Sequence, residues 1–217
     1  MRKLRLSTVA AVCALGTVIC FVAGAVAMGS SGRRGADSET GRPGRDWIAA
    51  VDRAGGLFFV GAWLVVLVGF LGIVALVGFY DTLRSAGPVM ILAPILGAVG
   101  LTLVTVSHLI PIAMGYELVP AYVAADPAGQ ATLAATVDTF AAIALVTNAA
   151  GNFLGFGMVV PLYAVAILTT RALPRWIGWL GLLVGAIGGW LGLLSPASSV
   201  ISSVSSIGFR GGRWEPS

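Results

Sequence analysis

Long apolar runs without a single charged residue restrict this chain more than any other feature of its sequence. The run from Leu57 to Tyr80 contains no Asp, Glu, Lys or Arg, and four further runs share this property. A helix needs about 20 apolar residues to cross ~30 Å of hydrocarbon, whereas the strands of a membrane barrel are shorter and alternate. Because backbone groups cannot stay unpaired in lipid, these runs are expected as transmembrane helices. The five expected spans are Leu6–Met28, Leu57–Tyr80, Pro88–Met114, Phe140–Thr170 and Trp176–Leu194.

The composition supports the same fold class. Hydrophobic residues make up 58% of the 217 residues and charged residues only 10%, whereas a soluble domain has roughly a quarter of its residues charged. The sequence therefore predicts an all-α fold, a polytopic transmembrane helix bundle of about five spans in a lipid bilayer. Residues 197–209 are too short to cross the membrane unaided, so they are expected to re-enter the bilayer, to lie at its interface or to belong to a truncated sixth span.

This pattern divides the chain into four segments. Residues 1–28 form the first transmembrane helix, 29–56 a flexible linker rich in Gly, Ser and Arg, 57–209 the helical membrane bundle, and 210–217 a polar tail. The first segment has a second interpretation, because its basic start, apolar run and Ala25-Val26-Ala27 also fit a signal peptide with a cleavage site. Its apolar core is longer than that of a usual signal peptide, which favours a retained helix.

The linker leaves two structures open. Its first part, through Gly44, has no hydrophobic pattern and is expected to be disordered. Asp46–Val51 fits a short interfacial helix, with Asp46 as the N-cap and Trp47 at the level of the lipid headgroups. A solvated loop is equally compatible with these residues.

The basic residues indicate how the bundle is oriented. They flank the apolar runs, where such residues set topology and contact lipid headgroups, so the net charge of +4 gives no reason to expect a nucleic-acid partner. Residues 115–137 are expected as a loop, with the fourth helix beginning early near Thr132, and they contain no Lys or Arg. Placing this loop outside puts Arg84, Arg171 and Arg175 inside. We therefore expect a multi-pass protein of the cell membrane with its N-terminus in the cytoplasm.

The sequence gives no reason to expect a cofactor, a metal or an enzymatic activity. Cys13 and Cys20 lie about 10 Å apart along a helix, which is too far for a disulfide, and no Cys or His cluster accompanies them. The phosphate-binding pattern GxxxxGK[ST], the zinc pattern HExxH and the nucleophile pattern GxSxG do not occur.

Spaced glycines predict close helix packing. Glycines four residues apart remove the side chains from one helix face, so that another backbone can approach it. Such a face could serve a neighbouring helix of the same chain, a second copy of the chain or another membrane protein. The first is favoured, because every helix of a bundle needs neighbours. The glycines concerned are Gly181, Gly185 and Gly189 in the last span, and Gly151 and Gly155 in the fourth.

Five polar residues in or near the spans are the candidates for a binding site. Asn148 and Asn152 share one helix face, with Asp138 near the same stripe, and His108 and Glu117 belong to the preceding span. With the N-terminus inside, His108, Asn148 and Glu117 lie toward the outer leaflet on adjacent antiparallel helices, and the less favoured interpretation is that they converge on one polar pocket. Ionisable groups are costly to keep in a membrane and often serve a function. The competing interpretation is structural, since intramembrane Asn and His side chains commonly bond to a neighbouring helix or a backbone carbonyl.

One stretch resembles a known family. Residues 155–163, Gly-Phe-Gly-Met-Val-Val-Pro-Leu-Tyr, and 171–181, Arg-Ala-Leu-Pro-Arg-Trp-Ile-Gly-Trp-Leu-Gly, are similar to bacterial multi-pass proteins catalogued as domain of unknown function 4386. The likeness is sharpest over residues 150–195. It implies a helix with a Tyr-bearing end, a basic turn and a Gly-rich helix, followed by a further helix that is cut short here. It implies no activity and no substrate.

Two functions are therefore expected from the sequence. The first is a non-enzymatic accessory or structural bundle that acts through helix packing. The alternative is a protein that binds or transports a small molecule or an ion through the His/Asn cluster.

Overall fold

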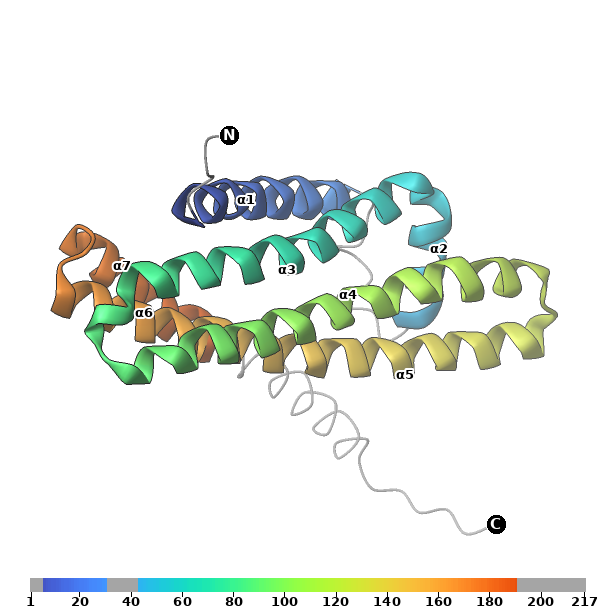
Figure 1. Cartoon of the computed structure of the whole chain (residues 1–217). Helices are drawn as coiled ribbons and strands as arrows, with labels where there is room; N and C mark the ends of the chain where they lie inside the picture. Colours follow the sequence, from blue (N-terminus) through green and yellow to red (C-terminus); the bar gives the residue numbers. More distant parts are fainter. Residues whose placement is uncertain (1–5, 31–42, 191–217) are drawn as a thin grey trace, which may run out of the picture.

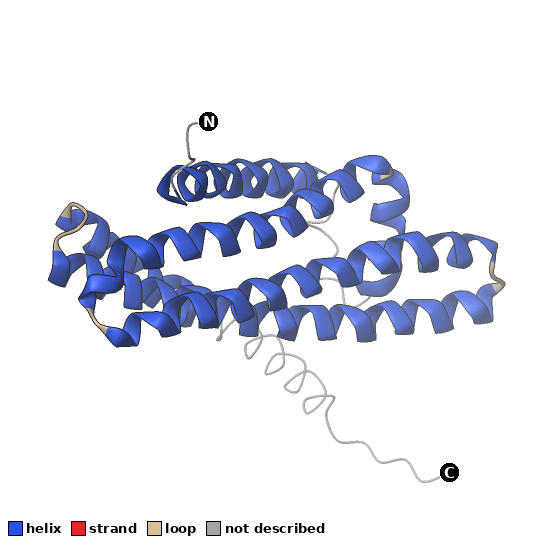
Figure 2. Ribbon diagram, in the orientation of Figure 1, coloured by secondary structure: helices blue, strands red, loops and turns tan. Residues whose placement is uncertain are grey.

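The computed structural model describes residues 6–30 and 43–190, and nearly all of them are helical. Within these ranges there is no β-strand (Figure 2). Four helical stretches are long and apolar enough to cross a membrane, and a fifth, shorter apolar helix accompanies them. The prediction of an all-α bundle of about five spans is confirmed.

The helices follow one another with short connections. Two turns of 3-10 helix, Arg84–Ala86 and Pro88–Ile91, connect α3 to α4, and a π-helical segment, Phe153–Val159, joins α5 to α6 without a break. A second π-helical segment, Ala186–Trp190, continues α7. The α-helices are α1 (Leu6–Ser30), α2 (Pro43–Ala54), α3 (Gly56–Leu83), α4 (Leu92–Ala124), α5 (Pro127–Asn152), α6 (Val160–Thr170) and α7 (Arg175–Gly185).

The long helices run side by side, as Figure 1 shows. Helix α1 lies along α3, α3 lies along α4, and α4 pairs with α5. Helices α6 and α7 fill the end of the bundle at which α3 turns into α4, whereas the short α2 lies near the opposite end (Figure 1).

The outer surface of this bundle is apolar. Val12 of α1 is 66% exposed, Val146 of α5 is 63% exposed and Trp176 of α7 is 64% exposed. Soluble monomers rarely expose apolar patches that continue over several elements. A surface of this kind is stable in hydrocarbon, which agrees with the length and composition of the helices.

The expected loop at residues 115–137 is wrong. Helix α4 continues to Ala124, and α5 begins at Pro127 after a turn of two residues. Asp126 caps α5, because its Oδ1 accepts a hydrogen bond of 2.8 Å from the backbone N–H of Gly129, and Pro127 suits the first helical position. The acidic residues suggested a loop because they end the apolar pattern, but they do not prevent helix formation outside the hydrocarbon.

A helix is present at Asp46–Val51, as one of the two interpretations had it, but Asp46 lies inside this helix instead of capping it, and the tryptophan does not lie at the surface. Helix α2 begins at Pro43, and Trp47 is only 6% exposed. The indole ring packs edge-on against Phe58 of α3, with ring centroids 5.8 Å apart. Ile48 and Val51 join the same core, which also includes Ile112 of α4 and Val137 of α5. The linker residues 31–42 lie outside the described ranges.

The described residues cover most of the last expected span. Helix α7 and its π-helical continuation run from Arg175 to Trp190, and residues 191–217 lie outside the described ranges. The end of the expected Trp176–Leu194 span, the truncated sixth span and the polar tail therefore stay predictions.

The glycine face of α7 contacts the same chain. Gly181 lies against Ala164 of α6, Gly185 against the Pro161 ring and the carbonyl of Phe156, and Gly189 against the backbone of Gly157. The close approach that the spacing predicted is therefore made between neighbouring helices of one bundle.

Two alanine substitutions on α7 test this packing. A Cβ at Gly185 would lie 2.6 Å from the Pro161 ring, whereas one at Gly188 would meet Phe156 at an ordinary 3.5 Å. We expect Gly185→Ala to lower the free energy of unfolding by about 1–3 kcal/mol through overpacking, and Gly188→Ala to change it by less than about 0.5 kcal/mol. Unfolding of the purified protein in mixed micelles measures both. Equal effects of the two substitutions would contradict the α6–α7 contact.

Candidate functional site

A small polar network joins α4 to α5 in the middle of their pairing. Ser107 of α4 is 4% exposed, and its Oγ lies 3.3 Å from Oδ1 of Asn148 on α5. The same Oγ lies 2.7 Å from the carbonyl of Val104 and 3.1 Å from Nδ1 of His108. Ser107 has a single hydroxyl proton, so it donates to one of these groups at a time and accepts from another.

The position of His108 is fixed by its own helix. Its Nδ1 lies 2.8 Å from the Val104 carbonyl, one turn earlier on α4. A carbonyl oxygen only accepts, so this contact requires the proton to be on Nδ1. His108 therefore belongs to a network of uncharged partners, namely a hydroxyl, a backbone carbonyl and, through Ser107, the amide of Asn148.

Asn152 lies one turn further along α5 and faces a different environment. It lines a cavity of about 210 Å³ between α3, α4 and the continuous helix of α5, the π-helical segment and α6. Among the described residues, the Asn152 amide has no hydrogen-bond partner. The other residues around the cavity are apolar: Gly72, Leu76, Gly97, Gly100, Leu101, Val104, Gly151, Gly155, Phe156, Val159 and Val160.

The two predicted packing glycines of α5 behave differently. Gly151 lies against the Gly100 carbonyl of α4, at 2.6 Å from an added Cβ, so its small size is required. A Cβ at Gly155 would meet nothing within 4 Å. Gly155 therefore contributes empty volume to the cavity, although its backbone nitrogen lies near Gly100.

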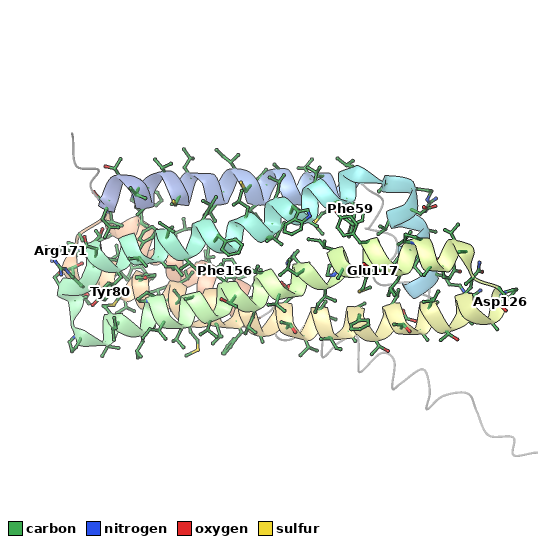
Figure 3. All side chains as sticks on the ribbon, turned by 45° about the vertical axis from the view of Figure 1, so that its right-hand side comes forward. Phe59, Tyr80, Glu117, Asp126, Phe156 and Arg171 are labelled. Atoms are coloured by element: carbon green, nitrogen blue, oxygen red, sulfur yellow. The ribbon has the colours of Figure 1, made fainter. Side chains whose placement is uncertain are left out.

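Glu117 and Asp138 do not join this network. Glu117 is exposed and lies about 13 Å beyond His108 along the axis of α4, at 1.5 Å per residue. Figure 3 shows Glu117 in the half of the molecule that ends at Asp126, and Phe156 of the cavity wall toward the opposite end. Asp138 points its Oδ1 toward Gly44 in the first turn of α2, at 3.0 Å from the position of an added Cβ. Of the five candidate residues, His108 and Asn148 are joined through Ser107, whereas Asn152, Glu117 and Asp138 lie elsewhere, so the five do not share a single polar pocket.

The carboxylate of Asp138 is unusual in its own right. Its Oδ1 is buried and has no hydrogen-bond partner among the described residues. It lies beside the N-terminal turn of α2, where the helix dipole favours negative charge. The arrangement holds α2 against α5, and it does so at the end of the bundle away from the cavity (Figure 1).

Two side chains matter more than the sequence indicated. Ser107 was not among the candidate residues, but it is the residue that reaches α5. Tyr163 of α6 is 7% exposed and donates a hydrogen bond of 2.9 Å to the carbonyl of Leu76 on α3. Both residues place a hydroxyl within an apolar run of the sequence. This signal could have found them, because such a hydroxyl needs an acceptor on a neighbouring helix.

The π-helical segment begins directly after Asn152. The backbone N–H of Val160 bonds to the carbonyl of Gly155, five residues earlier, and Pro161 has no N–H to continue the α-helical pattern. A π-turn widens the helix and often marks a functional site. Here it forms the wall of the cavity on the side of α6.

The side chains described above can form hydrogen bonds, but their arrangement does not indicate a metal site or a reaction. Within residues 6–30 and 43–190, no three His, Cys, Asp or Glu side chains gather closely enough to hold a metal ion. The chain matches no family model, no curated protein and no solved structure. The resemblance to domain of unknown function 4386 therefore stays a prediction.

A double-mutant cycle tests the bond between α4 and α5. We expect Ser107→Ala and Asn148→Ala to show a coupling energy of about 0.6 kcal/mol, the average for interhelical hydrogen bonds in a membrane protein. Thr147→Ala is the matched control, because the Thr147 hydroxyl bonds to the Ile143 carbonyl of its own helix. Unfolding in mixed micelles gives each free energy. If Ser107 couples to Thr147 as strongly as to Asn148, the network is not what joins the helices.

Proposed function

We propose that this protein is a non-enzymatic membrane helix bundle with an accessory or structural role. The observation that supports this proposal is the network of Ser107, His108 and Asn148, in which intramembrane polar groups bond to one another and to a backbone carbonyl. In a network of this kind the hydrogen bonds hold α4 and α5 together.

Ion transport through the same cluster is less well supported. A proton or cation path needs several ionisable groups in series within the membrane. The Ser107 hydroxyl and the Val104 carbonyl beside His108 are uncharged, and Glu117 is about 13 Å away along α4. Asp138 faces α2 instead of the network.

An accessory role requires a surface for a membrane partner, and α1 is the helix best suited to provide it. The glycine face of α7 is already occupied by α6, so it is not available to a second copy of the chain. Helix α1 packs along α3 at Gly24 and Ala10, while its other side exposes Leu15 and Val22. Either lipid or a partner helix covers that side.

A flux assay separates the proposed role from ion transport. We expect proteoliposomes containing the protein to conduct protons no faster than empty vesicles, as followed with a pH-sensitive dye inside them. His108→Ala should leave that rate unchanged, because the Ser107 hydroxyl and the Val104 carbonyl that His108 contacts do not carry a charge. A proton flux that the native protein supports and His108→Ala abolishes would replace the accessory role by transport.

The distribution of charge supports a cytoplasmic N-terminus in the cell membrane. Arg84 and Arg171 lie in the turns at the end of the bundle where α1 begins, whereas the α4–α5 turn at the opposite end holds Asp126 and no Lys or Arg (Figures 1 and 3). Helix α2, near that opposite end, carries Arg45 and Arg53, so it is the short turns that favour this orientation. Basic residues of short loops favour the cytoplasmic side. This orientation places the α4–α5 turn outside.

Cysteine labelling tests the orientation. In a variant whose Cys13 and Cys20 are replaced by alanine, we expect Ala128→Cys to react with a membrane-impermeant maleimide on intact cells. Ser85→Cys should react only after the membrane is permeabilised, because it lies in the turn at the other end. Both positions are exposed, so burial does not explain a failure to react. The reverse pattern would place the N-terminus outside.

A further inference from the structure

The cavity beside Asn152 is the feature that the accessory role does not use. It is walled by α3, α4 and the joined α5–α6 helix, and Gly72 places it near the middle of α3. The network of Ser107, His108 and Asn148 lies next to it, because Val104 lines the cavity and its carbonyl accepts the contacts from Ser107 and His108.

We propose that this cavity binds a small neutral molecule with an apolar, ring-sized body and one hydrogen-bonding group, which the amide of Asn152 holds. The site is independent of the accessory role proposed above and would persist if that role were disproved.

The glycines explain why the cavity is open. Gly100 and Gly151 hold α4 and α5 at backbone contact, which fixes two of the walls. Gly155 faces the space between them, where an added Cβ would meet nothing within 4 Å. The π-helical segment that follows Asn152 displaces the helix from the regular α-helical path, so the walls do not close over the gap. The cavity is open on one side to the surroundings of the bundle, so either a lipid chain or a ligand fills it.

Asn152 supplies the second argument. Its amide carries two donors and an acceptor, and none of the described residues bonds to it. In hydrocarbon no water is available to bond to this amide, and an amide left unpaired there is unfavourable. A ligand with one hydroxyl, N–H or carbonyl satisfies the amide, whereas the acyl chain of a lipid does not.

The lining sets the size and charge of the ligand. An engineered apolar cavity of ~150 Å³ binds benzene, and the cavity here measures about 210 Å³. A bicyclic ring of the size of indole is therefore suitable. Among the described residues, no Asp, Glu, Lys, Arg or His lines the cavity, so a charged ligand would lack a counter-ion there.

Indole and naphthalene are a matched pair of probes, because they share size and shape and only indole has an N–H donor. We expect saturation-transfer NMR on the protein in nanodiscs to detect saturable indole binding. Gly155→Leu should abolish that binding, since the leucine side chain fills the cavity. Asn152→Leu should weaken indole at least about tenfold and leave naphthalene within about twofold of the native affinity, because it removes the amide and keeps the volume.

The control is Gly56→Leu, another position at which an added Cβ meets nothing within 4 Å, but at the start of α3 and away from the cavity. It should bind indole as the native protein does, and indole dissolved in the lipid contributes equally to every variant. The melting temperature of Gly155→Leu should not fall, which shows that loss of binding is not loss of folding.

Three results would overturn the proposal. The first is no saturable binding of indole at millimolar concentration, and the second is equal binding by Gly155→Leu. The third is equal binding of indole and naphthalene by the native protein together with no effect of Asn152→Leu, which would indicate that a lipid acyl chain is the natural occupant.

Discussion

Contact between glycine backbones is the interaction on which the rest of this bundle depends. Helices surrounded by hydrocarbon gain little from burying apolar side chains, because lipid tails are equally apolar, so they associate through close packing. Such contacts occur at Gly24 against Gly61, Gly100 against Gly151 and Gly157 against Gly189. They join α1 to α3, α4 to α5, and the π-helical segment to the end of α7.

Polar groups add direction to this packing. Close glycine contacts bring two helices together but do not fix how each helix is rotated about its own axis. A hydrogen bond does, because it requires one particular donor to meet one particular acceptor. Ser107 to Asn148 fixes α4 relative to α5, and Tyr163 to the Leu76 carbonyl fixes α6 relative to α3. Because these bonds form away from water, each one also removes an unpaired polar group from the hydrocarbon.

The sequence was sufficient to predict the transmembrane spans and part of the helix packing, because the length of a run without charged residues and the spacing of glycines can both be read locally. It was insufficient for the ends of the helices. Residues 115–137 continue α4 and α5 beyond the apolar pattern, where capping by Asp126 and helix pairing decide the structure. Trp47 was assigned to the headgroups because Trp is enriched at membrane interfaces, but the core it enters is formed by distant residues such as Phe58. The candidate site failed for the same reason, since Glu117 shares a helix with His108 but not its neighbours.

The glycines that allow the helices to pack closely also leave a cavity between them. Removing side chains lets backbones meet at Gly100 and Gly151, but a glycine that faces a gap, such as Gly155, leaves volume that nothing fills. A chain selected only for tight packing would gain by replacing Gly155 with alanine, since glycine inside a helix is unfavourable and an added Cβ has room here. Retaining glycine at that position, one turn from the unpaired amide of Asn152, is what a binding cavity requires and what packing alone does not.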